Sequence, residues 1–129
     1  MRGSYILEIG LKEDKNVQIG KLGNIFFKKG SYLYVGSALN GIEQRVNRHL
    51  RENKKLHWHI DYLLKHATIT KVFYKQSNRK DECYVAKIIQ KNYSSILGFG
   101  SNDCKCKSHL FYGTFKDIKK LKGFKQFFI

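Results

Sequence analysis

The stretch Gly30-Ser31-Tyr32-Leu33-Tyr34-Val35-Gly36 decides the fold of this chain. Its aromatic and branched residues are typical of a β-strand, and side chains alternate along a strand, so Tyr32 and Tyr34 share one face. The hydrophobic period then becomes helical over residues 41–51, where apolar residues recur at a spacing of four. These residues are Ile42, Val46 and Leu50. A strand that leads into an amphipathic helix predicts a mixed α/β domain.

The remaining pattern predicts a small antiparallel sheet flanked by helices. Residues 3–9 alternate as a strand, and the polar segment 12–16 then predicts a hairpin turn. Because a further alternation at 17–19 precedes the strand at 31–36, we expect the first third to be a three-stranded antiparallel meander. Later elements are expected as a short helix near 60–64, a strand at 68–75, a helix at 82–91 and a short strand at 109–114.

Length and composition indicate one domain. A chain of 129 residues with 42% apolar residues can bury a single core, and no proline-rich linker divides it. We therefore expect one domain over residues 1–129. Its core should lie at about 3–91, followed by a loop, a short strand and a lysine-rich amphipathic tail within 92–129.

The charge of the chain points to a polyanionic partner. Lys and Arg number 25 against 10 Asp and Glu, which gives a formal net charge of +15. Such an excess attracts nucleic acid before any contact forms, although a lysine-rich solvated surface is the alternative explanation. No apolar run of about 18 residues predicts a membrane span. Three cysteines are a low and odd number, which does not fit a secreted disulfide framework, so we expect a cytoplasmic protein.

Arg45 and His49 are the first candidate functional pair. They lie four residues apart and border the apolar stripe of the helix, so packing could hold Arg45 rigidly enough to bind a phosphate. The alternative for Arg45 is an ordinary surface salt bridge. Other basic residues are expected on the solvent side, as mobile charges that contact a nucleic-acid backbone. These are Arg48, Arg51, Lys54 and Lys55.

Clustered phenols and one carboxylate complete the candidate chemistry. Tyr34, with Tyr5 from the first strand, could position or deprotonate a water, or the tyrosines could simply pack the sheet. Glu82 lies on the same side of its helix as Val85 and Ile89, so its carboxylate is directed inward. A buried charge needs a partner, and Mg²⁺ or Mn²⁺ would suit it; the alternative is a favourable interaction with the helix dipole.

Two further motifs offer metal ligands. His57 and His59 could add imidazoles near the site, or the segment could cap the following helix through Asp61. Cys104, Cys106 and His109 offer soft donors, but a structural zinc site needs four ligands and usually a wider spacing. Cys83 could join them only if the fold brings it over. We therefore expect no zinc, and a packing role for this loop beside the cleft.

These residues together resemble the GIY-YIG nuclease superfamily. In that family a Gly-x-Tyr strand, a Tyr-x-Gly strand, a helix arginine and a later glutamate converge on one site. The matching positions are Gly3, Tyr5, Tyr34, Gly36, Arg45, His49 and Glu82. Here 28 residues separate the two tyrosines, whereas the family usually has a much shorter hairpin. The residues of these motifs are similar to those of a divergent archaeal and bacterial subfamily. Domains of that subfamily are sometimes fused to base-excision repair enzymes.

The resemblance implies a metal-dependent endonuclease. Glu82 would bind Mg²⁺ or Mn²⁺, Arg45 would stabilise the charge on phosphate, and Tyr5 or Tyr34 would act on water with assistance from His49. The implied substrate is DNA in preference to RNA, with a role in DNA repair and a repair enzyme as the implied partner. Two alternatives stay open: a catalytically weak module that binds nucleic acid and recruits a repair partner, and an RNA- or ribosome-associated protein that needs no metal.

Overall fold

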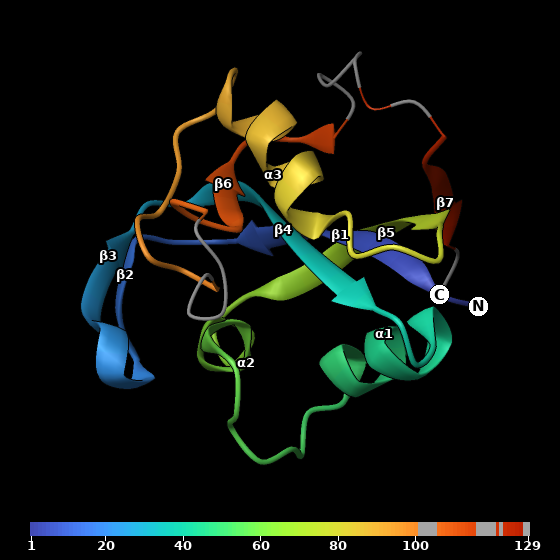
Figure 1. Cartoon of the computed structure of the whole chain (residues 1–129). Helices are drawn as coiled ribbons and strands as arrows, with labels where there is room; N and C mark the ends of the chain where they lie inside the picture. Colours follow the sequence, from blue (N-terminus) through green and yellow to red (C-terminus); the bar gives the residue numbers. More distant parts are fainter. Residues whose placement is uncertain (101–105, 116–120, 122, 128–129) are drawn as a thin grey trace.

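A computed structural model describes residues 1–100, 106–115, 121 and 123–127. Five antiparallel strands form the main sheet in the order β6-β4-β1-β5-β7 (Figure 1). Their bounds are β1 Gly3–Leu11, β4 Gly30–Ala38, β5 Thr68–Gln76, β6 Leu110–Tyr112 and β7 Lys125–Phe127. The helices are α1 Ile42–Leu50, α2 His59–Leu63 and α3 Glu82–Gln90. The predicted α/β class, with an antiparallel sheet flanked by helices, is confirmed.

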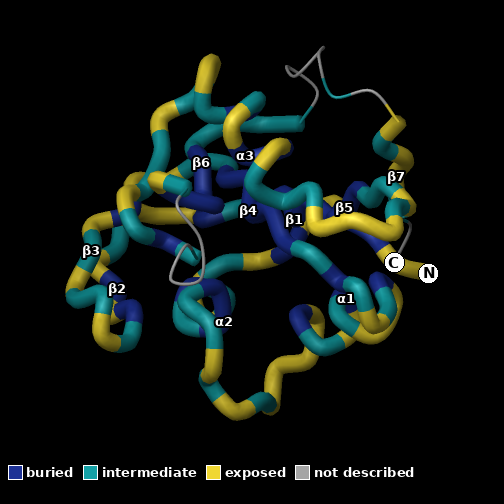
Figure 2. Tube along the Cα trace, in the orientation of Figure 1, coloured by how far each residue is buried: buried dark blue, intermediate teal, exposed yellow. Residues whose placement is uncertain are grey.

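Helices cover both faces of the sheet. Helices α1 and α2 pack on one face and α3 packs on the other (Figure 1). Strand β1 lies in the middle, so its alternating side chains enter two separate cores: Leu7 faces α1 and α2, whereas Ile6 faces α3. Figure 2 shows the consequence as a buried centre running along β1 and β4. The strand predicted at residues 3–9 is confirmed as β1.

The predicted three-stranded meander is wrong. Strand β1 pairs with β4 on one side and β5 on the other, so neither of its edges is open to the next strand along the chain. Residues 15–27 instead fold back on themselves as a separate hairpin of β2 (Lys15–Ile19) and β3 (Gly23–Phe27), joined by the short 3₁₀ turn Gly20–Leu22. The long connection between Tyr5 and Tyr34 is therefore a small sheet of its own.

Helix α1 buries a different set of residues from the predicted stripe. Ile42 and Val46 are fully buried, but Leu50 is 37% exposed and His49 takes the inward position near the end of the helix. The polar His49 is tolerated there because the Tyr5 hydroxyl provides a hydrogen-bond partner. The imidazole is thus placed against the sheet and not at the border of the apolar stripe.

Several other predicted elements are confirmed. The helix at 82–91, the short helix after Trp58, the strand at 68–75 and the strand within 109–114 correspond to α3, α2, β5 and β6. Strand β7 was not predicted, and part of the expected amphipathic tail lies outside the described residues. No helix in the described ranges is long and apolar enough to cross a membrane.

The short strand β6 leaves part of the β4 edge uncovered. It pairs only with Tyr32 to Tyr34, after which one more bond joins the Val35 N–H to the His109 carbonyl at 2.9 Å. Beyond that point, no described strand pairs with the end of β4 on this side. On this side, the last part of β4 therefore has no paired strand among the described residues.

Candidate functional site

A cleft of about 570 Å³ opens beside the uncovered end of β4. Tyr5 from β1, Tyr34 from β4, Arg45 from α1 and Glu82 from α3 all line it. We call Tyr5, Tyr34 and Arg45, with His49 behind them, the first wall. Glu82, Cys83 and His109 form the second wall. The structure therefore brings together four residues that come from four separate elements.

Gly36 sets the position of Tyr5 on the first wall. Tyr5 and Gly36 are cross-strand partners, and the Tyr5 ring lies directly over the glycine Cα. A Cβ at position 36 would overlap the Tyr5 ring atoms. The glycine of the Tyr-Val-Gly motif is therefore needed for close approach of the aromatic ring, and it allows the phenol to reach across β4 into the cleft.

Tyr5 and His49 form a buried phenol–imidazole pair. The Tyr5 hydroxyl lies 2.7 Å from His49 Nε2, and both side chains are almost fully buried. Burial raises the pKa of Tyr5, although the nearby Arg45 guanidinium lowers it in part. Burial also raises the pKa of Tyr34 and lowers the pKa of His49 to about 3. Both shifts favour the uncharged forms of the two side chains at neutral pH.

Arg45 is held in place by a carbonyl and an aromatic ring. Its guanidinium donates to the Ser37 carbonyl at 3.2 Å and lies 4.5 Å from the centre of the Trp58 ring. Both Ser37 and Trp58 also line the cleft. A stacked guanidinium loses little further side-chain entropy when it binds an anion. Arg45 is therefore a partly exposed cation whose orientation is already fixed.

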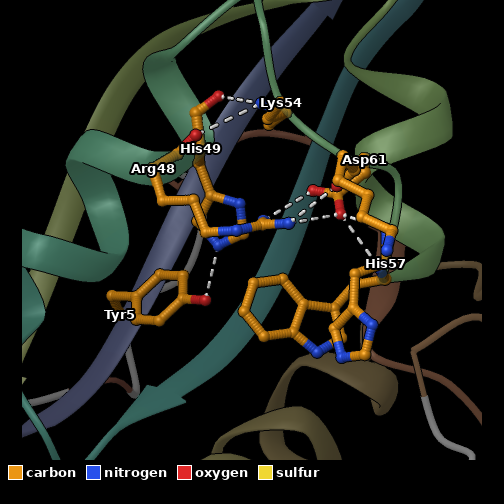
Figure 3. A network of polar contacts seen from close by, with 8 residues as sticks. Tyr5, Arg48, His49, Lys54, His57 and Asp61 are labelled. Carbon is orange, nitrogen blue, oxygen red and sulfur yellow. Dashed lines mark hydrogen bonds and ion pairs between the residues drawn. The ribbon is translucent and has the colours of Figure 1, made fainter.

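Arg48 and Lys54 support α1 and are not mobile surface charges. Arg48 donates from both terminal nitrogens to the Asp61 carboxylate, at 2.9 and 3.0 Å (Figure 3). Its guanidinium carbon lies 4.2 Å from the centre of the Trp58 ring. Lys54 Nζ donates to the carbonyl of His49 at 2.6 Å at the end of the helix. The expectation that Arg48 lies on the solvent side is wrong, because a fully buried carboxylate at Asp61 needs a cation.

Asp61 also confirms the capping alternative for the 57–61 segment. One of its oxygens accepts the backbone N–H groups of His57 and Trp58, each at 2.9 Å, at the start of α2 (Figure 3). These bonds and the Arg48 pair lower the pKa of Asp61 despite its burial. The His57 side chain is exposed, and His59 Nδ1 accepts the N–H of Gly100 at 2.9 Å. Neither histidine lines the cleft.

The exposed basic residues include two that were predicted and one, in the cleft, that was not. Arg51 and Lys55 are exposed, as expected for contacts with a polyanion. Lys80 lines the cleft, as Arg45 does, and was not predicted. It belongs to the polar connection between β5 and α3, so no periodic pattern marks it. Its position two residues before Glu82 is the signal that could have identified it.

Glu82 is a half-buried carboxylate with no partner in the part of the chain that the structure describes. It begins α3 and lines the cleft, and among the described residues it makes no ion pair or hydrogen bond. The helix-dipole alternative also holds, because Glu82 lies in the first turn. A carboxylate directed into a cleft has oxygens available for a hard divalent cation, which commonly uses one or two protein carboxylates and several waters.

Soft donors gather on the same wall. The Sγ atoms of Cys83 and Cys106 and a ring nitrogen of His109 all lie within 4.8 Å of one another. The fold thus brings Cys83 to the Cys-x-x-His segment, which the sequence alone did not indicate. Cys104, the other predicted donor, lies outside the described residues.

Comparison with known protein families matches residues 4–126 to one family, described as "Domain of unknown function DUF123". The chain belongs to the DUF123 family. No curated protein and no solved structure matches it. Since the matched range runs from β1 to β7, both walls of the cleft fall within the DUF123 domain.

Proposed function

We propose that this DUF123 protein is a metal-dependent endonuclease of the GIY-YIG type. The observation that carries the proposal is the convergence of Tyr5, Tyr34, Arg45 and Glu82 on one cleft. They come from β1, β4, α1 and α3, so their proximity is a product of the whole fold and not of local sequence. A hydroxyl, a fixed cation and an unpaired carboxylate around one space suit the hydrolysis of a phosphodiester bond.

Glu82 is the residue proposed to hold Mg²⁺ or Mn²⁺. Its carboxylate has no protein partner among the described residues, which fits an oxygen ligand for such an ion. When bound, the ion would polarise a phosphoryl oxygen and make a bound water more acidic.

Arg45 is proposed to bind the scissile phosphate. Its stacking on Trp58 and its bond to the Ser37 carbonyl leave further N–H donors that can meet phosphate oxygens. Because the guanidinium is already oriented, it can stabilise the extra negative charge of the transition state without reorganising.

Tyr5 and His49 are proposed to move the proton of the attacking water. Neither side chain is ionised at neutral pH, so Tyr5 is not a ready-made phenolate base. The short contact between them provides a route instead. As Tyr5 oxygen takes a proton from water, its own proton can pass to His49 Nε2, 2.7 Å away. Tyr34 completes the first wall as a hydrogen-bond donor.

The charge of the protein supports a nucleic-acid substrate. The net charge is +15, Lys80 is an exposed cation in the cleft, and Arg51 and Lys55 are exposed cations elsewhere on the surface. These groups would contact backbone phosphates and so raise affinity for any sequence. DNA is the proposed substrate, and matched DNA and RNA versions of each oligonucleotide test that choice.

Glu82→Gln is the variant that tests the proposal. It removes the charge and keeps the shape, so we expect cleavage with Mg²⁺ or Mn²⁺ to be lost while binding to the same oligonucleotide persists. Single-stranded, duplex, flap and branched substrates should be assayed with the wild type first. Glu52→Gln is the matched control, because Glu52 is exposed and does not line the cleft.

The outcomes separate the enzyme from a binding module. Equal cleavage by the wild type and Glu82→Gln would contradict the role of Glu82. Tight binding by the wild type without cleavage of any substrate, with either metal, would contradict the enzyme and favour a module that recruits another protein.

A further inference from the structure

We propose that Cys83, Cys106 and His109 form a binding site for one zinc ion on the second wall of the cleft. The site differs from the proposed Glu82 site in its donors and its metal, so it does not depend on the nuclease proposal. The sequence prediction of no zinc rested on donors that are too few and too close along the chain. The fold adds Cys83, from the first turn of α3, to the pair on the 106–109 segment.

The distances suit a small tetrahedral ion. All three donor atoms lie within 4.8 Å of one another, and Cys83 Sγ lies 3.8 Å from His109 Nε2. Zinc–sulfur and zinc–nitrogen bonds at a tetrahedral angle place such atoms about 3.6 Å apart. A small inward movement of the half-buried cysteine side chains would therefore close the site around zinc.

His109 is oriented by the protein for this role. Its Nδ1 lies 3.2 Å from the Val35 carbonyl, and a carbonyl can only accept, so Nδ1 carries the proton. The lone pair is then on Nε2, the nitrogen directed at Cys83. Backbone bonds from Val35 N–H to the His109 carbonyl and from His109 N–H to the Phe99 carbonyl fix the residue further. A second-shell carbonyl of this kind is common for zinc-bound histidine.

The donor set favours zinc over the hard cation expected at Glu82. Two sulfurs and one imidazole are soft or borderline ligands, which bind Zn²⁺ well and Mg²⁺ poorly. The thiols would lose their protons on binding, and three protein ligands would leave one position for water or another donor. The bound ion would join the start of α3 to the 106–109 segment and so fix the second wall.

Metal analysis of the intact chain tests this site. Protein purified in reducing buffer without added metal should contain one zinc per chain by elemental analysis. Cobalt(II) substituted for zinc should give thiolate-to-metal charge-transfer absorption. Cys83→Ser and Cys106→Ser should each weaken zinc affinity by more than about tenfold and reduce that absorption. His66→Ala is the control, since this exposed histidine is not in the cluster and its variant should bind zinc as the wild type does.

Thermal unfolding provides a second measurement that does not depend on activity. A zinc chelator should lower the melting temperature of the wild type but not that of Cys83→Ser, whose folding can be checked by circular dichroism. The proposal is overturned if the wild type shows no saturable binding of one zinc per chain, or if both cysteine variants bind zinc as tightly as the wild type. Glu82→Gln should keep full zinc content, so loss of cleavage and loss of zinc are separate results.

Discussion

The first wall of the cleft is fixed by protein contacts, whereas the second wall offers donors that suit metal ions. On the first wall, Tyr5 contacts His49, Arg45 stacks on Trp58, and a buried ion pair between Arg48 and Asp61 supports the helix behind them. On the second wall, Glu82 has no partner among the described residues. Protein contacts position the first wall, and we propose that bound cations complete the second.

The largest effect on the first wall should come from Asp61→Ala. The substitution leaves Arg48, whose side chain is only 20% exposed, without its anion, and it removes the acceptor at the start of α2. Breaking a buried pair in this way costs about 3–5 kcal/mol of unfolding free energy, which urea denaturation can measure. Asp14→Ala, which removes an exposed bond to the Lys29 N–H, should cost about 1 kcal/mol. Similar losses in the two variants would contradict a scaffold built on Asp61.

Gly36→Ala should damage the first wall more locally. The added methyl group overlaps the Tyr5 ring, so the ring must move away from His49, at a cost of about 1–3 kcal/mol for overpacking. Cleavage should fall with it. Gly10→Ala is the matched control on a neighbouring strand, because its methyl group would meet only Thr70 at an ordinary 3.4 Å. If Gly36→Ala keeps wild-type stability and activity, the close approach of Tyr5 to Gly36 has no function.

The pH dependence of stability should report the burial of His49. Its folded pKa is about 3 and its unfolded pKa is about 6.5, so below pH 6.5 the unfolded chain binds a proton that the folded protein does not. The free energy of unfolding should therefore fall with decreasing pH, by up to about 1.4 kcal/mol per pH unit. Asp61, whose pKa is lowered, stays ionised over pH 4.5 to 6.5 and does not produce this slope.

Urea denaturation of His49→Gln over the same pH range checks that assignment. In His49→Gln, the slope of the unfolding free energy against pH should be smaller by about the contribution of one proton. His66→Gln, at an exposed position, should keep the wild-type slope. An unchanged slope in His49→Gln would show that the imidazole is not held neutral against Tyr5.

Much of the first wall could be predicted from sequence because its residues lie on strongly periodic elements. The alternation around Tyr5 and Tyr34 and the helical period around Arg45 predicted which elements carry these side chains. Two features depended on tertiary contacts instead. His49 displaces Leu50 from the core because Tyr5 supplies a buried hydrogen bond, and Arg48 turns inward because Asp61 arrives from another helix. The hydrophobic period of a helix shows which of its own residues face the core. It does not show which residues of other elements, such as Tyr5 and Asp61 here, will contact them.

The second wall was less predictable. Glu82 was identified from its position on the inward side of α3. Lys80 lies in the polar connection between β5 and α3, where no hydrophobic period indicates which side chains face the cleft. Cys83 meets Cys106 and His109 only because β6 pairs with β4 and brings the 106–109 segment to the start of α3. In the same way, the β2–β3 hairpin could be separated from the main sheet only by knowing that β4 and β5 already occupy both edges of β1.

The most direct test of the nuclease proposal is a crystal structure of the protein with Mn²⁺ and an oligonucleotide that carries a non-hydrolysable phosphorothiolate linkage. Anomalous scattering locates manganese independently of the protein atoms. We expect manganese bound to a Glu82 carboxylate oxygen, and the modified phosphate between it and the Arg45 guanidinium, within reach of the Tyr5 hydroxyl. Manganese away from Glu82, or an oligonucleotide that crosses another surface and places no phosphate near Arg45, would contradict the assignment of this cleft as a phosphodiesterase site.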